Sequence, residues 1–205
     1  IGGAGNLGAM IAYNIAFEEL AEEIILIDIM EEKASAQAAD LNHGMAWEKD
    51  VEIYQGDYKD AKGADLFVIT AGKPRKPGMT RLDLIDANKA IIKEIAKKID
   101  EYAPESITVT TTNPIDVINF ALYRYGNRPR KKVIGEAGML DSARFRYVLS
   151  ERFGVKMTDV EAYILGEHGD KQVPLFSKKK IKNEKKNIES KGEQKEILNN
   201  LKGSA

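Results

Sequence analysis

One histidine, one carboxylate and one arginine have the residue types for acid–base chemistry on an anionic substrate. His168 lies in "GEHGD", between two glycines at the end of an apolar run. Asp141 and Arg144 lie three residues apart in a predicted helix, so they share one of its faces. Asp141 can hold the His168 imidazole in one tautomer and stabilise its charged form. Arg144 can offer its planar guanidinium to a substrate carboxylate.

Each of these residues also has a simpler interpretation. His168 can be a structural histidine, and Asp141 with Arg144 can form a salt bridge within one helix. The only other histidine, His43, falls late in a predicted helix, and we interpret it as a surface or capping residue. Since ligands of open parallel sheets gather at the carboxyl ends of strands, the place of His168 after an apolar run favours the catalytic interpretation.

A glycine cluster indicates a nucleotide site. The stretch "GAGNLG" places Gly3, Gly5 and Gly8 in the pattern G-x-G-x-x-G. We expect Gly3 to allow a tight turn, Gly5 to let the backbone approach a pyrophosphate, and Gly8 to let the helix pack closely on the sheet. Asp28 ends the next predicted strand, 20 residues after Gly8. A carboxylate there can accept hydrogen bonds from ribose hydroxyls and repels a 2′-phosphate, which favours NAD over NADP.

A basic segment and an amide follow two further predicted strands. "GKPRKPGMTRLD" (Gly72–Asp83) carries Arg75 and Arg81 together with prolines and glycines, directly after the apolar run "ADLFVITA". This composition predicts a lid that closes over an anion. Asn113 comes before Pro114 at the end of another strand, where its amide is expected to face the site.

The elements that position these residues alternate along the chain. Apolar, β-branched runs such as Glu23–Ile29 are separated by segments with helical periodicity. This alternation predicts an α/β fold with a parallel sheet covered on both faces. The expected helices are Asn6–Leu20, Glu31–Trp47, Leu82–Tyr102, Pro114–Tyr125 and Asp141–Phe153.

The composition excludes several classes of protein. The 205 residues carry a net charge of −1, which gives no global indication of nucleic-acid binding. The absence of cysteine excludes disulfides and thiolate metal sites and fits a cytoplasmic protein. Residues Lys178–Lys202 hold nine lysines and four glutamates. We interpret them as a solvated, mobile segment with a short amphipathic helix near Glu193–Leu201, because a nucleic-acid-binding tail would be expected to carry aromatic residues or arginine.

Taken together and in this order, the motifs "GAGNLG", "TAGKPRKPGMTRLDL", "TTNPIDV", "GMLDSARFR" and "GEHGD" resemble those of the lactate/malate dehydrogenase family. The resemblance runs from Ile1 to about Ser177 and is closest to the malate dehydrogenases of lactate-dehydrogenase-like type. It implies a Rossmann-type doubly wound domain over residues 1–113 and an α+β substrate domain over residues 114–205, incomplete at its C-terminus. The implied reaction is the reversible NAD-dependent oxidation of (S)-malate to oxaloacetate, in a cytoplasmic homodimer or homotetramer without a metal.

The resemblance also implies residue roles. His168 would exchange the proton, Asp141 would be its partner, and Arg81 would polarise the reacting carbonyl. Substrate would be bound by four residues: Arg75, Arg81, Asn113 and Arg144. Cofactor would be bound by Gly3, Gly5, Asn6, Leu7, Gly8, Asp28, Thr70, Ala71, Gly72, Asn88, Thr111 and Asn113.

Two alternatives stay open. The first is a dehydrogenase of L-lactate or another 2-hydroxy acid. Arg75 argues against it, because the family's lactate enzymes usually carry glutamine at the matching position, whereas its malate enzymes carry arginine. The second alternative is a non-catalytic NAD-binding protein of the same fold, which would not need His168, Asp141, Arg81 and Arg144 together.

Overall fold

The computed structural model describes residues 1–47, 49–74, 78, 81–169, 171–182 and 190–203. The chain divides into two compact units, Ile1–Gly135 and Glu136–Ala205. None of the helices formed by the described residues is long and apolar enough to cross a membrane.

The first unit alternates strands and helices, as the sequence predicts. Its elements are α1 (Asn6–Phe17), β1 (Glu23–Leu26), α2 (Glu31–Met45), β2 (Glu52–Gln55), β3 (Leu66–Ile69), α3 (Arg81–Tyr102), β4 (Ile107–Thr110), α4 (Ile115–Tyr125), the 3-10 turn η1 (Arg130–Lys132) and β5 (Val133–Gly135).

The strand pairs formed by the described residues of the first unit are parallel. β1 pairs with β2, and β4 pairs with β3 and β5. The first two residues connect these two groups, because Gly2 N–H donates to the Ile27 carbonyl (2.8 Å) and Thr70 N–H donates to the Ile1 carbonyl (2.9 Å). The order is therefore β2, β1, residues 1–2, β3, β4, β5. This is the doubly wound arrangement, whose order reverses beside residues 1–2, where such folds bind ligands.

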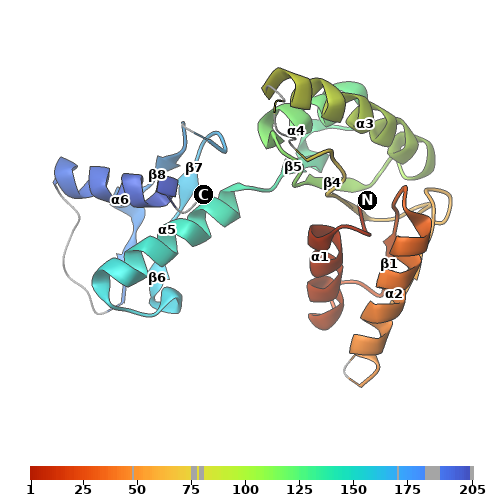
Figure 1. Cartoon of the computed structure of the whole chain (residues 1–205), viewed down its shortest axis with the longest axis horizontal. Coiled ribbons are helices and arrows are strands. Elements are labelled where there is room, and N and C mark those ends of the chain that lie inside the picture. The colour runs from red at the N-terminus through yellow and green to blue at the C-terminus, as the bar shows by residue number, and fades with distance from the viewer. Residues whose placement is uncertain (48, 75–77, 79–80, 170, 183–189, 204–205) are drawn as a thin grey trace. The chain divides into compact units, whose positions relative to one another are not determined.

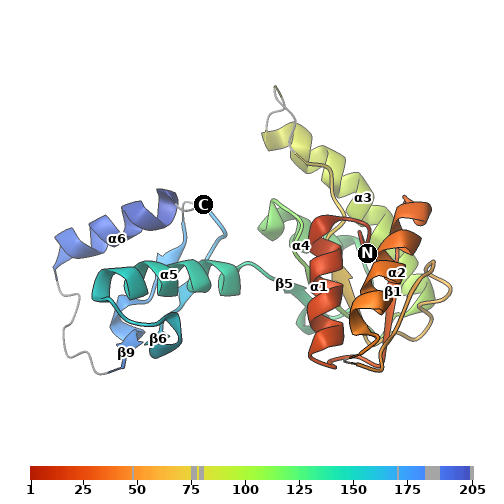
Figure 2. The same ribbon diagram turned by 60° about the horizontal axis from the view of Figure 1, so that its bottom comes forward.

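Two separate cores cover the two faces of this sheet (Figures 1 and 2). α1 and α2 pack on β1 and β2 through small residues such as Ala16, Ala34 and Ala38. α3 and α4 pack on the other strands through larger aliphatic residues, including Ile99 and Leu122. Parallel strands that are covered on both faces consist of continuous apolar runs in the sequence. This is why the apolar runs of the sequence predict the strands.

The second unit is α+β, as the resemblance implies. Its elements are α5 (Gly138–Phe153), η2 (Met157–Asp159), β6 (Val160–Glu161), β7 (Ile164–Leu165), β8 (Val173–Pro174), η3 (Phe176–Lys178), β9 (Lys180–Ile181) and α6 (Lys191–Gly203). β6 pairs with β9 and β7 pairs with β8, both antiparallel. α5 also begins three residues earlier than expected, so that Asp141 lies in its first turn.

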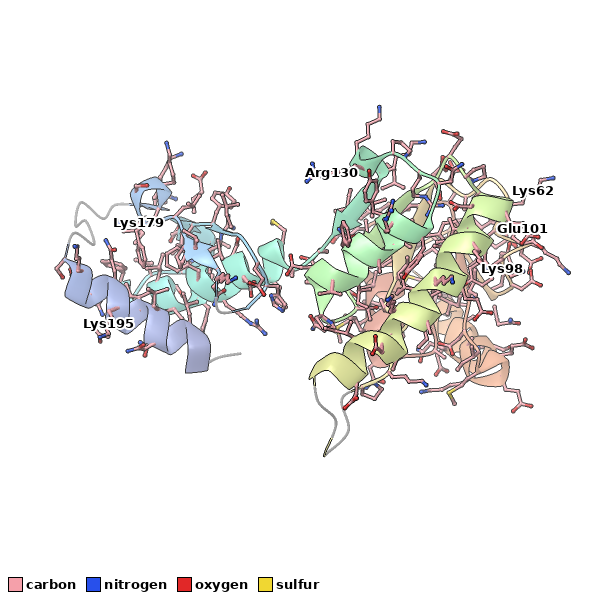
Figure 3. All side chains as sticks on the ribbon, turned by 90° about the horizontal axis from the view of Figure 1, so that it is seen from above. Lys62, Lys98, Glu101, Arg130, Lys179 and Lys195 are labelled. Carbon is pink, nitrogen blue, oxygen red and sulfur yellow. The ribbon has the colours of Figure 1, made fainter. Side chains whose placement is uncertain are left out.

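The lysine-rich segment contributes to the core of the second unit. Ile197 and Leu201 of α6 are buried in one cluster with Phe145 and Leu149 of α5, and Figure 2 shows the two helices side by side. The guanidinium of Arg152 on α5 pairs with two glutamates of α6, at 3.3 and 3.0 Å. The predicted amphipathic helix is therefore confirmed. The expectation of a solvated segment is wrong for residues 190–203, because two apolar side chains one helical turn apart anchor the helix. Its polar face carries lysines that point outward, as Lys195 does in Figure 3.

The domain boundary also needs correction. The sequence interpretation ended the first domain at Asn113, whereas the compact unit extends to Gly135. The additional residues belong to the first unit because α4 packs against α3, and because Val133 and Gly135 of β5 pair with Thr108 and Thr110 of β4.

Candidate active site

His168, Asp141 and Arg144 form one connected cluster in the second unit. The Nδ1 atom of His168 lies 2.7 Å from Oδ2 of Asp141. The other carboxylate oxygen, Oδ1, accepts a hydrogen bond from Nη1 of Arg144 at 3.2 Å. The histidine–carboxylate pair and the salt bridge within the helix, which the sequence left as competing interpretations, therefore occur together on one carboxylate.

The burial of Asp141 makes this pairing important. Its side chain is only 7% exposed, against 22% for His168 and 29% for Arg144. A carboxylate removed from water needs compensating partners, and here each oxygen has one. The less buried histidine and arginine keep part of their surface open to solvent.

A hairpin loop positions His168. β7 and β8 pair antiparallel, and residues 166–172 connect them. Gly166 has a φ of +99°, and a Cβ there would lie 2.9 Å from the carbonyl of Lys171, so the turn requires glycine. The sequence argument that placed His168 at the carboxyl end of a parallel strand is therefore wrong about the setting. Gly166, directly before "EH", is the local residue that could have indicated the tight turn.

Ser142 fixes this hairpin to the helix that carries Asp141. Its buried hydroxyl donates to the carbonyl of Gly138 (2.6 Å) and accepts from the N–H of Ile164 on β7 (3.0 Å). The α5 turn with Asp141 and the strand that leads to His168 are thus connected through one side chain. Sequence reasoning missed Ser142, since its partner in β7 is distant along the chain and no local pattern reveals it.

The glycine turn of the first unit includes Gly3, as expected. The N–H of Gly5 donates to the carbonyl of Gly2 at 3.1 Å across Gly3 and Ala4, and the positive φ, +85°, belongs to Gly2 directly before the turn. Gly3 also permits close packing on β1, because a Cβ there would lie 2.9 Å from Cβ of Leu26. Gly8 has the predicted packing role, since a Cβ on it would collide with the Gly2 carbonyl.

The start of α1 fits a pyrophosphate. Gly5 is its N-cap in extended conformation, and no side-chain cap satisfies the first turn among the residues described for this unit. The N–H of Gly5 donates to the Gly2 carbonyl, whereas Asn6 and Leu7 are exposed and begin the helix, where free N–H groups and the helix dipole favour an anion. The Asp28 carboxylate accepts from the N–H groups of Ala4 and Met30, both at 3.0 Å, which holds it beside the glycine turn. These residues fit a dinucleotide.

Further predicted cofactor residues gather at the same sheet edge. The Thr70 hydroxyl lies 3.1 Å from the carbonyls of both Ile1 and Gly2, which ties the end of β3 to the glycine turn. Ala71 and Gly72 follow β3, and Thr111 and Asn113 follow β4. Gly72 and Asn113 are exposed, whereas Ala71 and Thr111 are partly buried. Asn88, in contrast, is 1% exposed, and its amide hydrogen-bonds to main-chain atoms of Lys73 and Asn113.

Three other residues complete the comparison with the sequence. Arg75 lies outside the described residues. Arg81 is the first residue of α3, but its side chain lies outside the description. His43 is exposed in the last turn of α2, as expected of a surface residue.

The sheet with its glycine turn defines a dinucleotide-binding α/β protein, to which the second unit adds a histidine–carboxylate pair. Residues 1–135 match the family model for the lactate/malate dehydrogenase NAD binding domain, and residues 138–202 match that for the alpha/beta C-terminal domain. The chain belongs to the lactate/malate dehydrogenase family.

Individual relatives include enzymes of both names. The chain is 49% identical to a malate dehydrogenase of Natronomonas pharaonis, over 100% of this chain and 68% of the relative. It is 46% identical to an L-lactate dehydrogenase of Acetivibrio thermocellus, over 85% of this chain and 55% of the relative. The malate dehydrogenase structure from Picrophilus torridus has a TM-score of 0.91 at 34% identity, over 98% of this chain and 65% of that one. The chain thus spans about two thirds of the length of its malate dehydrogenase relatives.

Proposed function

We propose that the protein is an NAD-dependent malate dehydrogenase, which catalyses the reversible oxidation of (S)-malate to oxaloacetate. The observation that carries the proposal is the pairing of His168 with the buried carboxylate of Asp141 at 2.7 Å. A protein that only bound NAD would not need this pair. The higher identity to malate dehydrogenases than to L-lactate dehydrogenases supports malate as the substrate.

The bound cofactor would supply hydride chemistry, and the residues of the chain would handle the proton and the charges. With Nδ1 engaged by Asp141, His168 would exchange its proton with the substrate oxygen through Nε2. In the reductive direction the imidazolium donates this proton, and Asp141 stabilises the cationic form until transfer. In the oxidative direction the neutral ring accepts the proton of the alcohol.

The substrate would be held by arginines. Arg144 lies one helical turn from Asp141 and would bind the carboxylate next to the reacting carbon, with guanidinium nitrogens other than the Nη1 that pairs with Asp141. On their sequence motifs, we assign Arg81 to the reacting carbonyl oxygen and Arg75 to the second carboxylate. Asn113 would contact the substrate and the nicotinamide end of the cofactor.

The test is the initial rate of NADH oxidation by the purified protein with oxaloacetate and with pyruvate. We expect a higher kcat/KM for oxaloacetate. A preference for pyruvate would overturn the proposed substrate and favour the lactate alternative. NADH binding without oxidation by either 2-oxo acid would instead favour the non-catalytic alternative. The same assay with NADPH tests the preference that Asp28 predicts.

We also propose that the enzyme is a cytoplasmic homo-oligomer. Large apolar side chains lie exposed along α1, including Met10 at 65% and Phe17 at 41%, and exposed apolar patches mark protein–protein contact sites. A second copy of the chain is the partner that we propose for this face. Light scattering during size-exclusion chromatography tests the proposal, and a monomer at micromolar concentration would contradict it.

A further inference from the structure

Asn88 has an environment that a direct cofactor ligand would not have. It lies on α3, and only 1% of its surface is exposed. Its Oδ1 accepts a hydrogen bond from the N–H of Lys73 at 2.7 Å. Its Nδ2 donates to the carbonyl of Asn113 at 3.1 Å and makes a longer contact to the carbonyl of Lys73 at 3.5 Å. Both ends of the carboxamide are thus used by main-chain atoms.

These main-chain atoms belong to two segments that end at the cofactor edge of the sheet. Residues 71–73 follow β3, and residues 111–113 follow β4. The Thr112 hydroxyl donates to the carbonyl of Ala71 at 2.8 Å, which connects the segments directly. A Cβ at Gly72 would collide with the Thr112 side chain, so the backbone of Gly72 packs closely against that side chain. Asn88 joins both segments to α3.

The chemistry of the side chain is specific to this task. One group must accept from an N–H on one segment and donate to a carbonyl on the other. Among side chains of this size, asparagine offers an acceptor and a donor without charge and without the need to bind a proton. An aspartate would lack the donor, and a leucine would lack both and leave buried main-chain groups without partners.

We infer that Asn88 is a positioning residue, which holds the Asn113 backbone and thereby aims the Asn113 side chain at the substrate. The inference rests on the proposed function, because that function assigns a role to Asn113. It replaces the cofactor contact that the resemblance implied for Asn88. A displacement of about 1 Å in a group that orients substrate can lower turnover by about 100-fold.

A double-mutant cycle tests whether Asn88 acts through Asn113. In the purified enzyme, Asn88→Ala is expected to lower kcat for oxaloacetate by about 10- to 100-fold, with the NADH dissociation constant within about 3-fold of wild type. Combined with Asn113→Ala, it should lower kcat by no more than about 3-fold further, because the group that it positions is already absent. Fluorescence titration gives the NADH affinity independently of turnover.

Asn42→Ala is the matched control. Asn42 also donates to main-chain carbonyls, those of Ala38 and Ile53, but on the opposite face of the first unit. It should lower the melting temperature and leave kcat unchanged. If Asn88→Ala does not fold, Asn88→Asp keeps the volume and the acceptor for Lys73 but lacks the donor to Asn113, and it should show the same loss of kcat.

Three results would overturn the inference: multiplicative losses in the double mutant, a loss of NADH affinity as large as the loss of kcat, or wild-type kcat in Asn88→Asp. Failure of the proposed function is seen separately and first, because the wild-type protein would then not reduce oxaloacetate.

Discussion

The substitution Asp141→Asn tests the proton-transfer geometry most directly. It preserves the size of the side chain but replaces one carboxylate oxygen by an NH₂ group. In the native protein the two oxygens accept separately from His168 and Arg144. An amide has only one acceptor, its oxygen. If this oxygen faces His168, the NH₂ group faces the guanidinium of Arg144, which is also a donor. If the oxygen faces Arg144, the NH₂ group donates to Nδ1 of His168. The second arrangement forces the ring proton onto Nε2 and fixes the wrong tautomer for accepting a proton from malate.

The magnitude follows from the contact and its burial. A hydrogen bond between charged groups contributes about 1.5–3 kcal/mol, and the 2.7 Å separation is at the short end for such bonds. The 7% exposure of Asp141 reduces solvent screening and favours the upper value, although the histidine is more exposed. About 3 kcal/mol corresponds to a roughly 150-fold lower kcat/KM. At a comparable histidine–carboxylate pair, loss of the correct tautomer lowers kcat by about 10⁴-fold, which sets an upper bound for the effect.

The assay is steady-state oxidation of NADH by oxaloacetate, with the NADH dissociation constant measured in parallel. We expect the cofactor affinity to be unchanged, because the residues proposed to bind it lie in the first unit. Asp159→Asn is the control, since Asp159 also pairs with a cation in the second unit, Lys182 at 3.9 Å, but is 30% exposed. A folded Asp141→Asn protein with kcat/KM within about 3-fold of wild type would refute the role of the pair.

Four further predictions concern other parts of the molecule. Arg75→Gln should lower the oxaloacetate-to-pyruvate ratio of kcat/KM by roughly 30-fold or more, the cost of an unpaired charge; an unchanged ratio contradicts the assignment. Gly8→Ala should abolish measurable NADH binding, because its Cβ meets the Gly2 carbonyl; wild-type affinity by titration would contradict this. Ile197→Ala should destabilise the second unit by about 2–5 kcal/mol in urea unfolding, whereas a solvated α6 would give no change. Burial, with a smaller contribution from the charge of Glu94, raises the pKa of Tyr58 from 10.0 to about 12. The stability that its neutral form contributes should therefore be complete below pH 10 and be lost towards pH 12. In a plot of the urea unfolding midpoint against pH, Tyr58→Phe should reduce the fall between pH 10 and pH 12.

The fold was predictable from the sequence wherever burial imposes a periodic pattern. Strands buried on both faces gave continuous apolar runs, and α1 to α5 were expected within a few residues of their observed ends. β1 ends at Leu26 rather than at Ile29. The Leu26 carbonyl still accepts from the N–H of Gly56 after β2, and the Ile27 carbonyl faces the other side, where it accepts from the N–H groups of Gly2 and Gly3. Where the pairing with β2 stops depends on contacts between distant residues, which local pattern cannot show.

The candidate site was predictable to the level of residue types and motifs. Asp141 and Arg144 share a helix face by spacing alone, but the hydrogen bond of Asp141 to His168 spans two elements and needed the structure. Ser142 and Asn88 show the limit most clearly. Each is a small polar residue in a helix, and its importance comes from a main-chain partner more than 20 residues away. The glycine turn shows another limit, since adjacent glycines leave open which one adopts positive φ, and the structure has it at Gly2, directly before Gly3.

The docking of α6 on α5 determines the order in which the chain can fold. The second core needs Phe145 and Leu149 from its beginning and Ile197 and Leu201 from its end, so it cannot close until α6 has been synthesised. The sheet of the first unit is complete once β5 has formed, and its pairs β1–β2, β3–β4 and β4–β5 each join strands that follow one another in the chain. On the ribosome, we therefore expect the nucleotide-binding unit to become protease-resistant first. The histidine–carboxylate pair would be the last part of the machinery to acquire its geometry.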